Sequence, residues 1–351
     1  MRKLASIQRI IDIKPIENAD NIELATVLGW HVVIAKKDNF HIGDLVVYIE
    51  IDSILPKENP AFAFLEGRRL RTKKLRGVYS QGIVFHIDTL FDNNNFKEGD
   101  DVTKQLGIIK YEPEPEVYKE KKNNKWYMKF KIGRWFWKKF LYKPSKKSFP
   151  FWIPKSDEIR IQVLNDIIEQ YQGLECEFTE KVDGSSITFW LDEKGKLHVC
   201  SRNYEILDHE DVYYKTASKL IDNMKKTYAE TIFQGELLGP KIQGNKYKLK
   251  DYKILVYNVG KKNNLWSYYS PHEVSVILKS INIEQVPILG TCTITNVDDL
   301  VKLSEGKSKL ANIQREGIVV RPLNNIKIDS RFPGSRLSFK VINPKFLLKY
   351  E

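Results

Sequence analysis

Two strand-like segments meet at a short turn that contains a lysine, an acid and a glycine. Leu174–Glu180 precedes the turn and Ser185–Leu191 follows it, and both have the composition and length of β-strands. The turn, residues 181–184, is Lys-Val-Asp-Gly. Its glycine permits a backbone bend that a Cβ atom would resist. We therefore predict that the two segments pair as antiparallel strands and that rigid neighbours fix the lysine.

The side chains of this turn fit nucleophilic catalysis. A buried lysine amine beside a carboxylate and a tight turn can attack the α-phosphate of a nucleotide and form a covalent lysyl-nucleotide. The tetrapeptide alone is weak evidence, because a Lys-x-Asp-Gly sequence arises by chance roughly once in ten such chains. A solvated hairpin turn is the alternative, so the interpretation depends on the rest of the chain.

The length and amino-acid composition are those of an ordinary soluble protein. The 351 residues suffice for two domains with separate cores, at 42% hydrophobic and 29% charged residues. No apolar run approaches the length of a membrane span, and the N-terminus has no signal-peptide core. Three widely spaced cysteines favour a reducing compartment and no disulfide framework, and they lack zinc spacing with the six histidines. We expect a cytoplasmic protein that contacts no membrane.

Residues 1–110 contain a series of short strand-like segments. Trp30–Ala35, Leu45–Ile51 and Gln81–His86 are rich in β-branched and aromatic residues. Short strands at close spacing without a long helix favour a small barrel. The segments Pro15–Asp20, Gly43-Asp44 and Asp52–Pro56 resemble those of OB-type RNA-binding modules. We predict an OB-fold nucleic-acid-binding domain over residues 1–110.

A basic segment lies between two of these strands. Six cations fall within nine residues: Arg68, Arg69, Arg71, Lys73, Lys74 and Arg76. On an OB barrel such a loop is placed to follow a phosphate backbone. A solvated loop is the alternative, and we predict that the six cations bind nucleic acid.

Most of the net charge of +12 lies in one stretch. Residues 111–155 hold 13 Lys and Arg against 4 Asp and Glu, and the prolines of Glu112–Glu116 mark a linker. Lys125–Lys139 then interleaves aromatic residues with cations. This composition suits nucleic-acid binding, a strand pair that covers a core, or a membrane surface. We assign residues 111–148 to a basic and aromatic linker or insert.

The remaining residues, 149–351, alternate helical and strand-like patterns. Ser156 can cap a helix that Gly173 ends, residues 212–228 predict a second amphipathic helix, and Ser270–Glu273 is a capping box that begins a third. Strand-like segments lie between these helices. The pattern predicts an α+β layout.

Five further motifs follow the lysine in order: Ser201–Asn203, Phe233–Gly239, Ile254–Val259, Glu316–Arg321 and Leu337–Ile342. In the last one, strand alternation places Leu337, Phe339 and Val341 on one face and Arg336, Ser338 and Lys340 on the other. We therefore expect Lys340 to point away from the core.

This ordered set closely resembles the nucleotidyltransferase motifs of ATP-dependent ligases. With a barrel in front, the chain is similar to the RNA ligase family that has an N-terminal OB domain. DNA ligases and mRNA capping enzymes usually carry the OB domain after the catalytic domain, whereas only eleven residues follow Lys340 here. The resemblance implies an OB-type β-barrel followed by a nucleotidyltransferase domain, residues 149–351, of ATP-grasp-like antiparallel sheets plus helices.

The resemblance also implies the roles of individual residues. Lys181 is the nucleophile that takes AMP from ATP, and Lys340 and Arg202 act with it in catalysis. The nucleotide-binding residues are Glu180, Lys181, Arg202, Glu236, Tyr257 and Lys340, and the residues at the Mg²⁺ or Mn²⁺ ion are Asp183, Glu236 and Glu316. Many relatives carry a second lysine where Ser338 stands, so either Arg336 or another cation substitutes for it, or pyrophosphate release is managed differently.

The chemistry explains these residue types. A lysine attacks only as a neutral amine, and nearby cations such as Lys340 and a bound metal lower its pKa. Carboxylates then hold the metal, and in-line phosphoryl chemistry depends mostly on positioning and charge neutralisation.

We therefore predict a monomeric RNA ligase that joins 5′-phosphate and 3′-hydroxyl RNA ends in three steps, with RNA repair at nicks as its role. Two alternatives stay open. One is a DNA-sealing or guanylyl-transferring enzyme. The other is a non-catalytic RNA-binding protein that keeps the fold, in whose favour Ser338 is the main feature.

Overall fold

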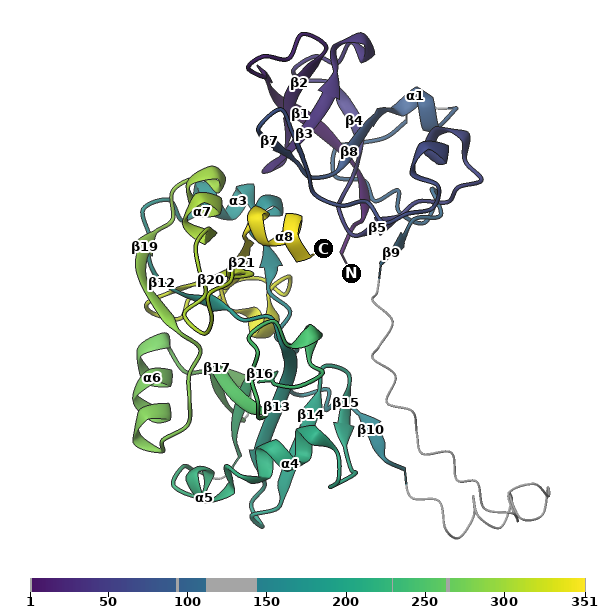
Figure 1. Ribbon diagram of the computed structural model, residues 1–351. Helices are drawn as coiled ribbons and strands as arrows, with labels where there is room; N and C mark the ends of the chain where they lie inside the picture. Colours follow the sequence, from purple (N-terminus) through teal and green to yellow (C-terminus); the bar gives the residue numbers. More distant parts are fainter. Residues whose placement is uncertain (1, 93–94, 112–143, 229, 263–265, 351) are drawn as a thin grey trace, which may run out of the picture.

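The computed structural model describes residues 2–92, 95–111, 144–228, 230–262 and 266–350 (Figure 1). Residues 112–143, which include the aromatic and basic run of the predicted insert, lie outside the described residues, so the three interpretations of that run stay predictions. The predicted linker does end in a strand: β10 (Lys146–Ser148) joins the larger sheet of the catalytic domain.

The N-terminal domain is built on one antiparallel sheet in the order β3-β2-β1-β4-β8. Its strands are β1 (Ala5–Pro15), β2 (Ile22–Val27), β3 (Trp30–Ala35), β4 (Leu45–Ile49) and β8 (Ile83–His86). The sheet curls until β3 contacts β8, so the predicted OB-type barrel is confirmed. Both faces are covered, because Val46 and Tyr48 of β4 point into one core cluster while Val47 and Ile49 point into another.

Short elements complete the barrel domain. They are η1 (Lys36–Asp38), η2 (Pro60–Leu65), α1 (Ile87–Leu90), the pair β5 (Ser53–Ile54) and β9 (Ile109–Lys110), and the hairpin β6 (Lys73–Leu75) and β7 (Val78–Ser80). Gly82 links this hairpin to β8 with φ +120, and a Cβ atom there would lie 2.4 Å from the Tyr48 ring. The Tyr48 hydroxyl donates to the Gln81 carbonyl at 2.8 Å, which holds the segment before Gly82 against β4.

The domain that follows, from residue 144 onward, contains two sheets. The larger has the order β10-β15-β14-β13-β16-β17-β18, and the smaller has the order β11-β21-β20-β12-β19. The larger sheet adds β13 (Ser185–Leu191), β14 (Leu197–Ser201), β15 (Tyr204–Ile206), β16 (Thr231–Leu238), β17 (Lys253–Lys262) and β18 (Trp266–Tyr268). The smaller consists of β11 (Ile159–Arg160), β12 (Glu175–Lys181), β19 (Ile288–Thr293), β20 (Gly317–Pro322) and β21 (Phe339–Ile342).

The prediction that the strands on either side of the lysine turn pair with each other is wrong. β12 pairs with β19 and β20 in the smaller sheet, whereas β13 pairs with β14 and β16 in the larger one. The turn therefore carries the chain from one sheet to the other. Gly184 is needed for space rather than for an unusual φ, because a Cβ atom there would lie 2.8 Å from the Leu237 carbonyl of β16.

Helices cover the outer faces of both sheets. Ala217, Met224 and Leu278 of α4 (Val212–Ser218), α5 (Ile221–Met224) and α6 (Pro271–Ser280) pack on the larger sheet. Ile167 and Leu300 of α3 (Asn165–Gln170) and α7 (Val297–Ser304) pack on the smaller. The inner faces of the two sheets meet through side chains, since Arg336 donates to Asn258 and Arg321 lies over the Tyr257 ring. We call this region between the two sheets the cleft. None of the described helices is long and apolar enough to cross a bilayer.

Two of the three predicted helices differ from the expectation. Residues 156–164 do not begin a helix: Ile159–Arg160 is β11, η5 (Ile161–Val163) follows, and α3 begins at Asn165. The apolar stripe is nevertheless buried, since Ile161, Leu164 and Ile167 all join the core of the smaller sheet. The second helix is broken into α4 and α5, where Ser218 Oγ donates to a main-chain carbonyl. The capping box that starts α6 is confirmed.

The two domains touch through three kinds of contact. The Gly29 amide donates to the Gln162 carbonyl at 2.8 Å, and Asp52 of the barrel pairs with Arg160 at 3.0 Å. Ile342 and Leu347, from β21 and α8 (Pro344–Tyr350), join a core cluster of the barrel. Figure 1 shows α8 on the side of the catalytic domain that faces the barrel.

Candidate active site

Lys181 forms an ion pair at the mouth of the cleft. It is the last residue of β12, and its Nζ lies 2.5 Å from Glu316 Oε1. Glu316 immediately precedes β20, and the register places Lys181 opposite Gly317. A Cβ atom on Gly317 would lie 2.2 Å from the Val341 carbonyl, so only glycine lets β20 and β21 approach here. The backbone of three strands thus brings the lysine and the acid together.

The two other candidate acids reach the site from opposite sides of the turn. Asp183 pairs with Lys246, and its amide donates to the Tyr247 hydroxyl at 2.8 Å. Glu236 lies on β16, next to the Leu237 carbonyl that Gly184 approaches. A Cβ atom on Gly184 would lie 3.1 Å from the Cβ of Glu236, so Glu236 adjoins the turn that carries Lys181 and Asp183.

Burial and charge shift the proton affinities of these groups in opposite directions. Burial raises the pKa of Glu236 to about 8, with Glu316 and Asp183 adding to the effect and Lys181 opposing it. Burial alone would lower the pKa of Lys181, but Glu316, Glu236 and Asp183 together raise it. Without ligand, Lys181 is therefore a charged ammonium group.

This result corrects the expectation that Lys340 lowers the pKa of Lys181. The lowering falls on Lys340 instead: burial, then Lys181 and Arg160, bring the pKa of Lys340 to about 7. Acidic neighbours outweigh burial at Lys181, whereas at Lys340 burial, Lys181 and Arg160 outweigh Asp157 and Glu316, so Lys340 loses its proton more readily.

The acidic residues fit a hydrated divalent cation better than a directly bound one. No group of three or more His, Cys, Asp or Glu side chains within the described ranges is arranged to hold a metal ion. Glu236 and Glu316 each have a buried Oε2 atom without a hydrogen-bond partner. Such atoms are costly when left unpaired, and they can accept hydrogen bonds from the water ligands of an ion.

Tyr257 lies on the inner face of the larger sheet. Its hydroxyl is 2.5 Å from Ser156 Oγ, and its ring packs beside Val182 and Leu255. Arg321 lies over the same ring, with its guanidinium carbon 5.9 Å from the centroid. The next residue, Asn258, is buried and accepts a hydrogen bond from Arg336 at 2.8 Å.

The strand that carries Lys340 has the predicted alternation. Leu337, Phe339 and Val341 are fully buried in the core of the smaller sheet. Arg336 reaches across the cleft to the larger sheet through Asn258, and Lys340 lies on the same face. Lys340 therefore points away from this core, as predicted, and toward the larger sheet.

Two predicted nucleotide-binding residues have other contacts. Arg202 is exposed and pairs with Asp157 at 2.6 Å; Asp157 also influences Lys340 and Glu236, which places Arg202 at the rim of the cleft. The Glu180 carboxylate is buried and accepts hydrogen bonds from Ser308 Oγ and from the Lys309 amide, at 2.8 Å in the second case. Its side chain thus secures a loop beside the site.

The predicted basic segment is divided by its contacts. Five of its cations are exposed: Arg68, Arg71, Lys73, Lys74 and Arg76. Arg69 instead pairs with Asp52 and stacks on the Tyr111 ring, with its guanidinium carbon 4.5 Å from the centroid. Arg69 is thus tied into the barrel, whereas the other five are free of such burial and can face a ligand.

Sequence reasoning missed three cations of the site. Arg160 was placed in a helix, but β11 puts it opposite Lys340 in register. Lys246 pairs with Asp183, although nothing in its lysine-rich neighbourhood distinguishes it. Arg321 pairs with Glu158 at 3.1 Å and reaches Tyr257. Only Arg321 lay inside a motif that the sequence singled out.

Comparison with known proteins agrees with this geometry. Family models described as RNA ligase and as OB-fold domain match residues 174–342 and 4–87. The solved structure of Naegleria gruberi RNA ligase with PPi is 31% identical, with a TM-score of 0.81, over 100% of this chain and 99% of that one. The chain belongs to the RNA ligase family. The predicted RNA ligase with an N-terminal OB domain is therefore confirmed.

Two further structures of the Naegleria gruberi RNA ligase are similar over 99% of each chain. One is a glutamate-to-alanine mutant with ATP and Mn, at 30% identity and a TM-score of 0.82. The other is a lysine-to-methionine mutant with AMP and Mn, at 31% identity and a TM-score of 0.81. No curated protein sequence matched the chain.

Proposed function

We propose that this RNA ligase uses ATP to join 5′-phosphate and 3′-hydroxyl ends through a covalent lysyl-AMP. Lys181 Nζ attacks the α-phosphorus, a phosphoramidate bond forms, and pyrophosphate leaves. The AMP then passes to a 5′-phosphate on RNA, and the 3′-hydroxyl attacks that activated phosphate and releases AMP. The observation that carries the proposal is the Lys181–Glu316 pair, which has Glu236, Asp183 and Lys340 as its charged neighbours.

The carboxylates set the condition for the first step. Among the acids, Glu316 raises the pKa of Lys181 most and keeps the amine protonated, so the charge of Glu316 has to be neutralised before the amine can attack. Glu236, Glu316 and Asp183 would hold Mg²⁺ or Mn²⁺ through its water ligands, and a bound cation supplies that neutralising charge. Asp183 has to break its ion pair with Lys246 before it can bind a water ligand of the metal ion. Lys246 and the hydrated ion therefore compete for the Asp183 carboxylate.

Other residues of the cleft suit the nucleotide. Tyr257 offers a ring held in place by Ser156, on which adenine can stack. Lys340 points into the cleft and would neutralise the α-phosphate, whose own charge would raise the pKa of Lys340 above 7. Arg202 would bind the incoming RNA end after its ion pair with Asp157 breaks.

RNA is the proposed partner, and repair of nicks is the proposed role. The five exposed cations of the basic segment lie on the barrel and suit a phosphate backbone. The similar structures of the Naegleria gruberi RNA ligase are complexes with PPi, with ATP and Mn, and with AMP and Mn, which agrees with the proposed chemistry.

The decisive experiment is labelling with α-³²P-ATP and Mn²⁺. Wild-type protein should retain label after denaturation, and Lys181→Ala should retain none. Lys215→Ala, which removes an exposed lysine paired with Glu210, is the matched control and should label normally. Undiminished labelling of Lys181→Ala would remove the lysine from its assigned role.

A second experiment separates RNA sealing from the alternatives. Matched nicks with RNA or DNA on each side of the break would be offered with ATP or GTP. We expect sealing with ATP at breaks whose 3′-hydroxyl strand is RNA. Preference for DNA on both sides, or labelling by GTP alone, would favour a DNA ligase or a guanylyltransferase instead.

A further inference from the structure

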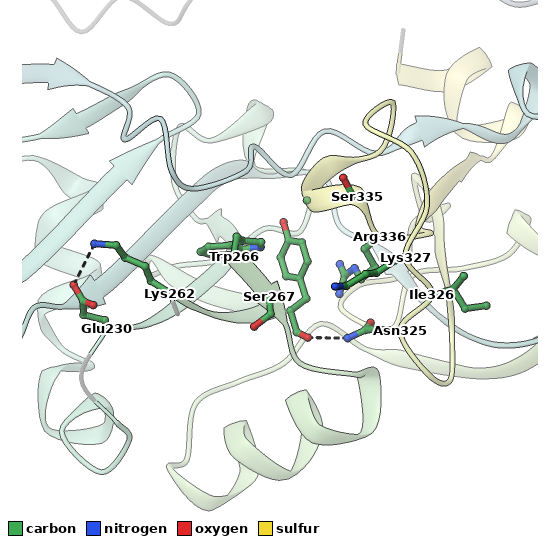
Figure 2. A pocket seen from close by; sticks show the side chains of 11 residues that line it. Glu230, Lys262, Trp266, Ser267, Asn325, Ile326, Lys327, Ser335 and Arg336 are labelled. Carbon is green, nitrogen blue, oxygen red and sulfur yellow. Dashed lines mark hydrogen bonds and ion pairs between the residues drawn. The ribbon is translucent and has the colours of Figure 1, made fainter. Parts of the chain in front are cut away.

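A second pocket of about 710 Å³ opens between the edge strand β18 and the loop over residues 325–336 (Figure 2). Figure 2 shows Lys262 and Trp266 on one side and Lys327 and Arg336 on the other. Its volume lies in the range typical of sites for small organic ligands. None of the proposed catalytic or metal-binding residues lines it.

A hydrogen-bonded wall separates this pocket from the cleft around Tyr257. Arg336 donates to Asn258 Oδ1 at 2.8 Å, and both Asn258 Nδ2 and the Tyr268 hydroxyl lie 3.3 Å from Gln234 Oε1. The pocket is nevertheless close to the reaction centre. Arg336 precedes Lys340 by four residues, so their Cα atoms are at most about 14 Å apart.

Two aromatic rings form one side of the pocket. Trp266 and Tyr268 have centroids 5.2 Å apart and planes at 82°. Glycines make room for them: a Cβ atom on Gly260 would lie 2.4 Å from the indole, and one on Gly334 would lie 2.5 Å from the phenol. Both rings are half-buried, so they are fixed in place and still present surface to a ligand.

The polar groups of the pocket favour an anionic ligand with hydrogen-bond acceptors. Lys262 and Lys327 are exposed at its rim, and the single acid, Glu230, lies 3.9 Å from Lys262. Arg336 is only 6% exposed, its guanidinium carbon lies 3.9 Å over the Tyr268 ring, and its buried Nε has no hydrogen-bond partner. The buried Ser267 Oγ is likewise unpartnered.

We propose that this pocket binds one ribonucleotide of the RNA substrate beside the break, with the base on Trp266 and the backbone phosphates between Lys262 and Lys327. Aromatic rings next to cations are the usual means of holding an unpaired nucleotide. Arg336 Nε and Ser267 Oγ supply donors for the base or the sugar. Because both lysines are exposed, the strand can continue out of the pocket on either side. The assignment of RNA depends on the proposed function.

The test measures binding of a fluorescent nicked RNA duplex that lacks the 3′-hydroxyl, so that no sealing occurs. Trp266→Ala should weaken binding about tenfold, from the loss of one stacked base, and Trp266→Phe should keep affinity within about threefold. Lys327→Ala should weaken binding severalfold and reduce its salt dependence. Lys219→Ala, an exposed lysine beyond α4, is the control and should bind as wild type.

Two further measurements identify the ligand of the pocket. Wild-type protein crosslinked to RNA with 5-iodouridine at successive positions around the nick should attach at Trp266 or Tyr268 from one position only. Labelling of Lys181 by ATP should be normal in Trp266→Ala, which distinguishes a failure of this proposal from a failure of the catalytic assignment.

Three results would overturn the proposal. One is unchanged RNA affinity of Trp266→Ala together with crosslinks that avoid β18. Another is a variant that loses affinity for free AMP but keeps its affinity for RNA, which would assign the pocket to a mononucleotide. The third is a loss of Lys181 labelling in Trp266→Phe, which would make the ring part of the ATP-dependent step.

Discussion

Asp52 and Arg160 form an ion pair that joins the barrel to the catalytic domain, with Oδ2 and Nη2 3.0 Å apart. Arg160 stands opposite Lys340 in the parallel pairing of β11 and β21, so the two side chains share one face. Asp52 also accepts Arg2 and Arg69. The barrel thus holds, through one carboxylate, a cation that acts directly on a proposed catalytic lysine.

The first prediction concerns the loss of this carboxylate. Asp52→Ala leaves three guanidinium groups without their shared partner, two of them largely buried, and should lower the free energy of unfolding by about 3 kcal/mol. It should also slow labelling of Lys181, because Arg160 loses its ion pair with Asp52. Urea unfolding and single-turnover labelling measure the two effects. Glu98→Gln, which breaks an exposed pair with Arg9, should change stability by less than about 1 kcal/mol.

The stabilising contribution of Asp52 depends on pH, and the direction follows from its lowered pKa. Burial alone would raise the pKa of the Asp52 carboxyl, but Arg160, Arg69 and Arg2 lower it. Its stabilising contribution is therefore present above the pKa of an unfolded aspartate, about 3.9, and disappears as the pH falls through the lower folded value. The stability difference between wild type and Asp52→Ala should be constant from pH 5 to pH 7 and shrink below pH 4. A difference that grows on acidification would contradict the assignment.

The next prediction separates the cations of the basic segment. Replacing Lys73 and Lys74 together by Ala should weaken RNA binding and lower the slope of log K against log salt by up to about 1.5, with stability unchanged, because both are exposed. Arg69→Ala should instead reduce stability, since Arg69 binds Asp52 and Tyr111. Anisotropy at several salt concentrations and urea unfolding separate the two effects. Equal effects of the two variants on both measurements would show that Arg69 and the exposed lysines do not have different roles.

The sequence could not make that division, and the reason is general to this fold. Several signals carried by residues close in the chain were read correctly, as in the capping box of Ser270 and Glu273 or the alternation from Leu337 to Val341, although the helix expected to begin at Ser156 was not. Partners distant in the chain could not be read. Nothing local shows that Arg69 meets Asp52, or that the strand after Lys181 leaves for another sheet.

The candidate site shows the same limit. The order of the motifs predicted that Lys181 and Glu316, which are 135 positions apart, belong to one site. A single residue gives no such indication of a distant partner. Lys246 and Arg160 belong to no such motif, and only the folded chain reveals their contacts with Asp183 and Asp52.

A further prediction concerns Ser338, which stands where many relatives carry a lysine. Ser338 is 2% exposed and its hydroxyl has no partner, while Arg336 bonds to Asn258 across the cleft. Ser338→Lys would add a buried cation between Arg336 and Lys340 and should destabilise the protein by about 3 kcal/mol. The double variant Ser338→Lys with Arg336→Ser should recover much of that loss, since one cation replaces another.

Thermal or urea unfolding of both variants and of Arg336→Ser alone gives the coupling energy. Ser338→Ala is the control, and it should be neutral because it removes only an unpaired hydroxyl. Strict additivity of the two substitutions would show that Arg336 does not occupy the electrostatic role of the missing lysine.

The last prediction concerns His198, which lies between two acids on the larger sheet. Its Nδ1 is 2.8 Å from Glu205 Oε1 and its Nε2 is 3.3 Å from Asp192 Oδ2, while its ring stacks on Trp190 with centroids 4.8 Å apart. The hydrogen bond to Glu205 raises the pKa of His198, and Asp192 adds to the effect although burial opposes it. The histidine therefore favours folding when it is protonated.

The sign of the effect follows from that direction. A raised folded pKa gives stability that is fully present below the unfolded value, about 6.5, and is lost as the pH rises through the folded value. The stability difference between wild type and His198→Gln should be about 2 kcal/mol at pH 6 and close to zero at pH 9. His209→Gln, which removes a ring stacked on Tyr214, is the control and should change stability equally at both pH values. A His198→Gln difference that is the same at pH 6 and pH 9 would show that stacking on Trp190, rather than the two carboxylates, accounts for what this histidine contributes.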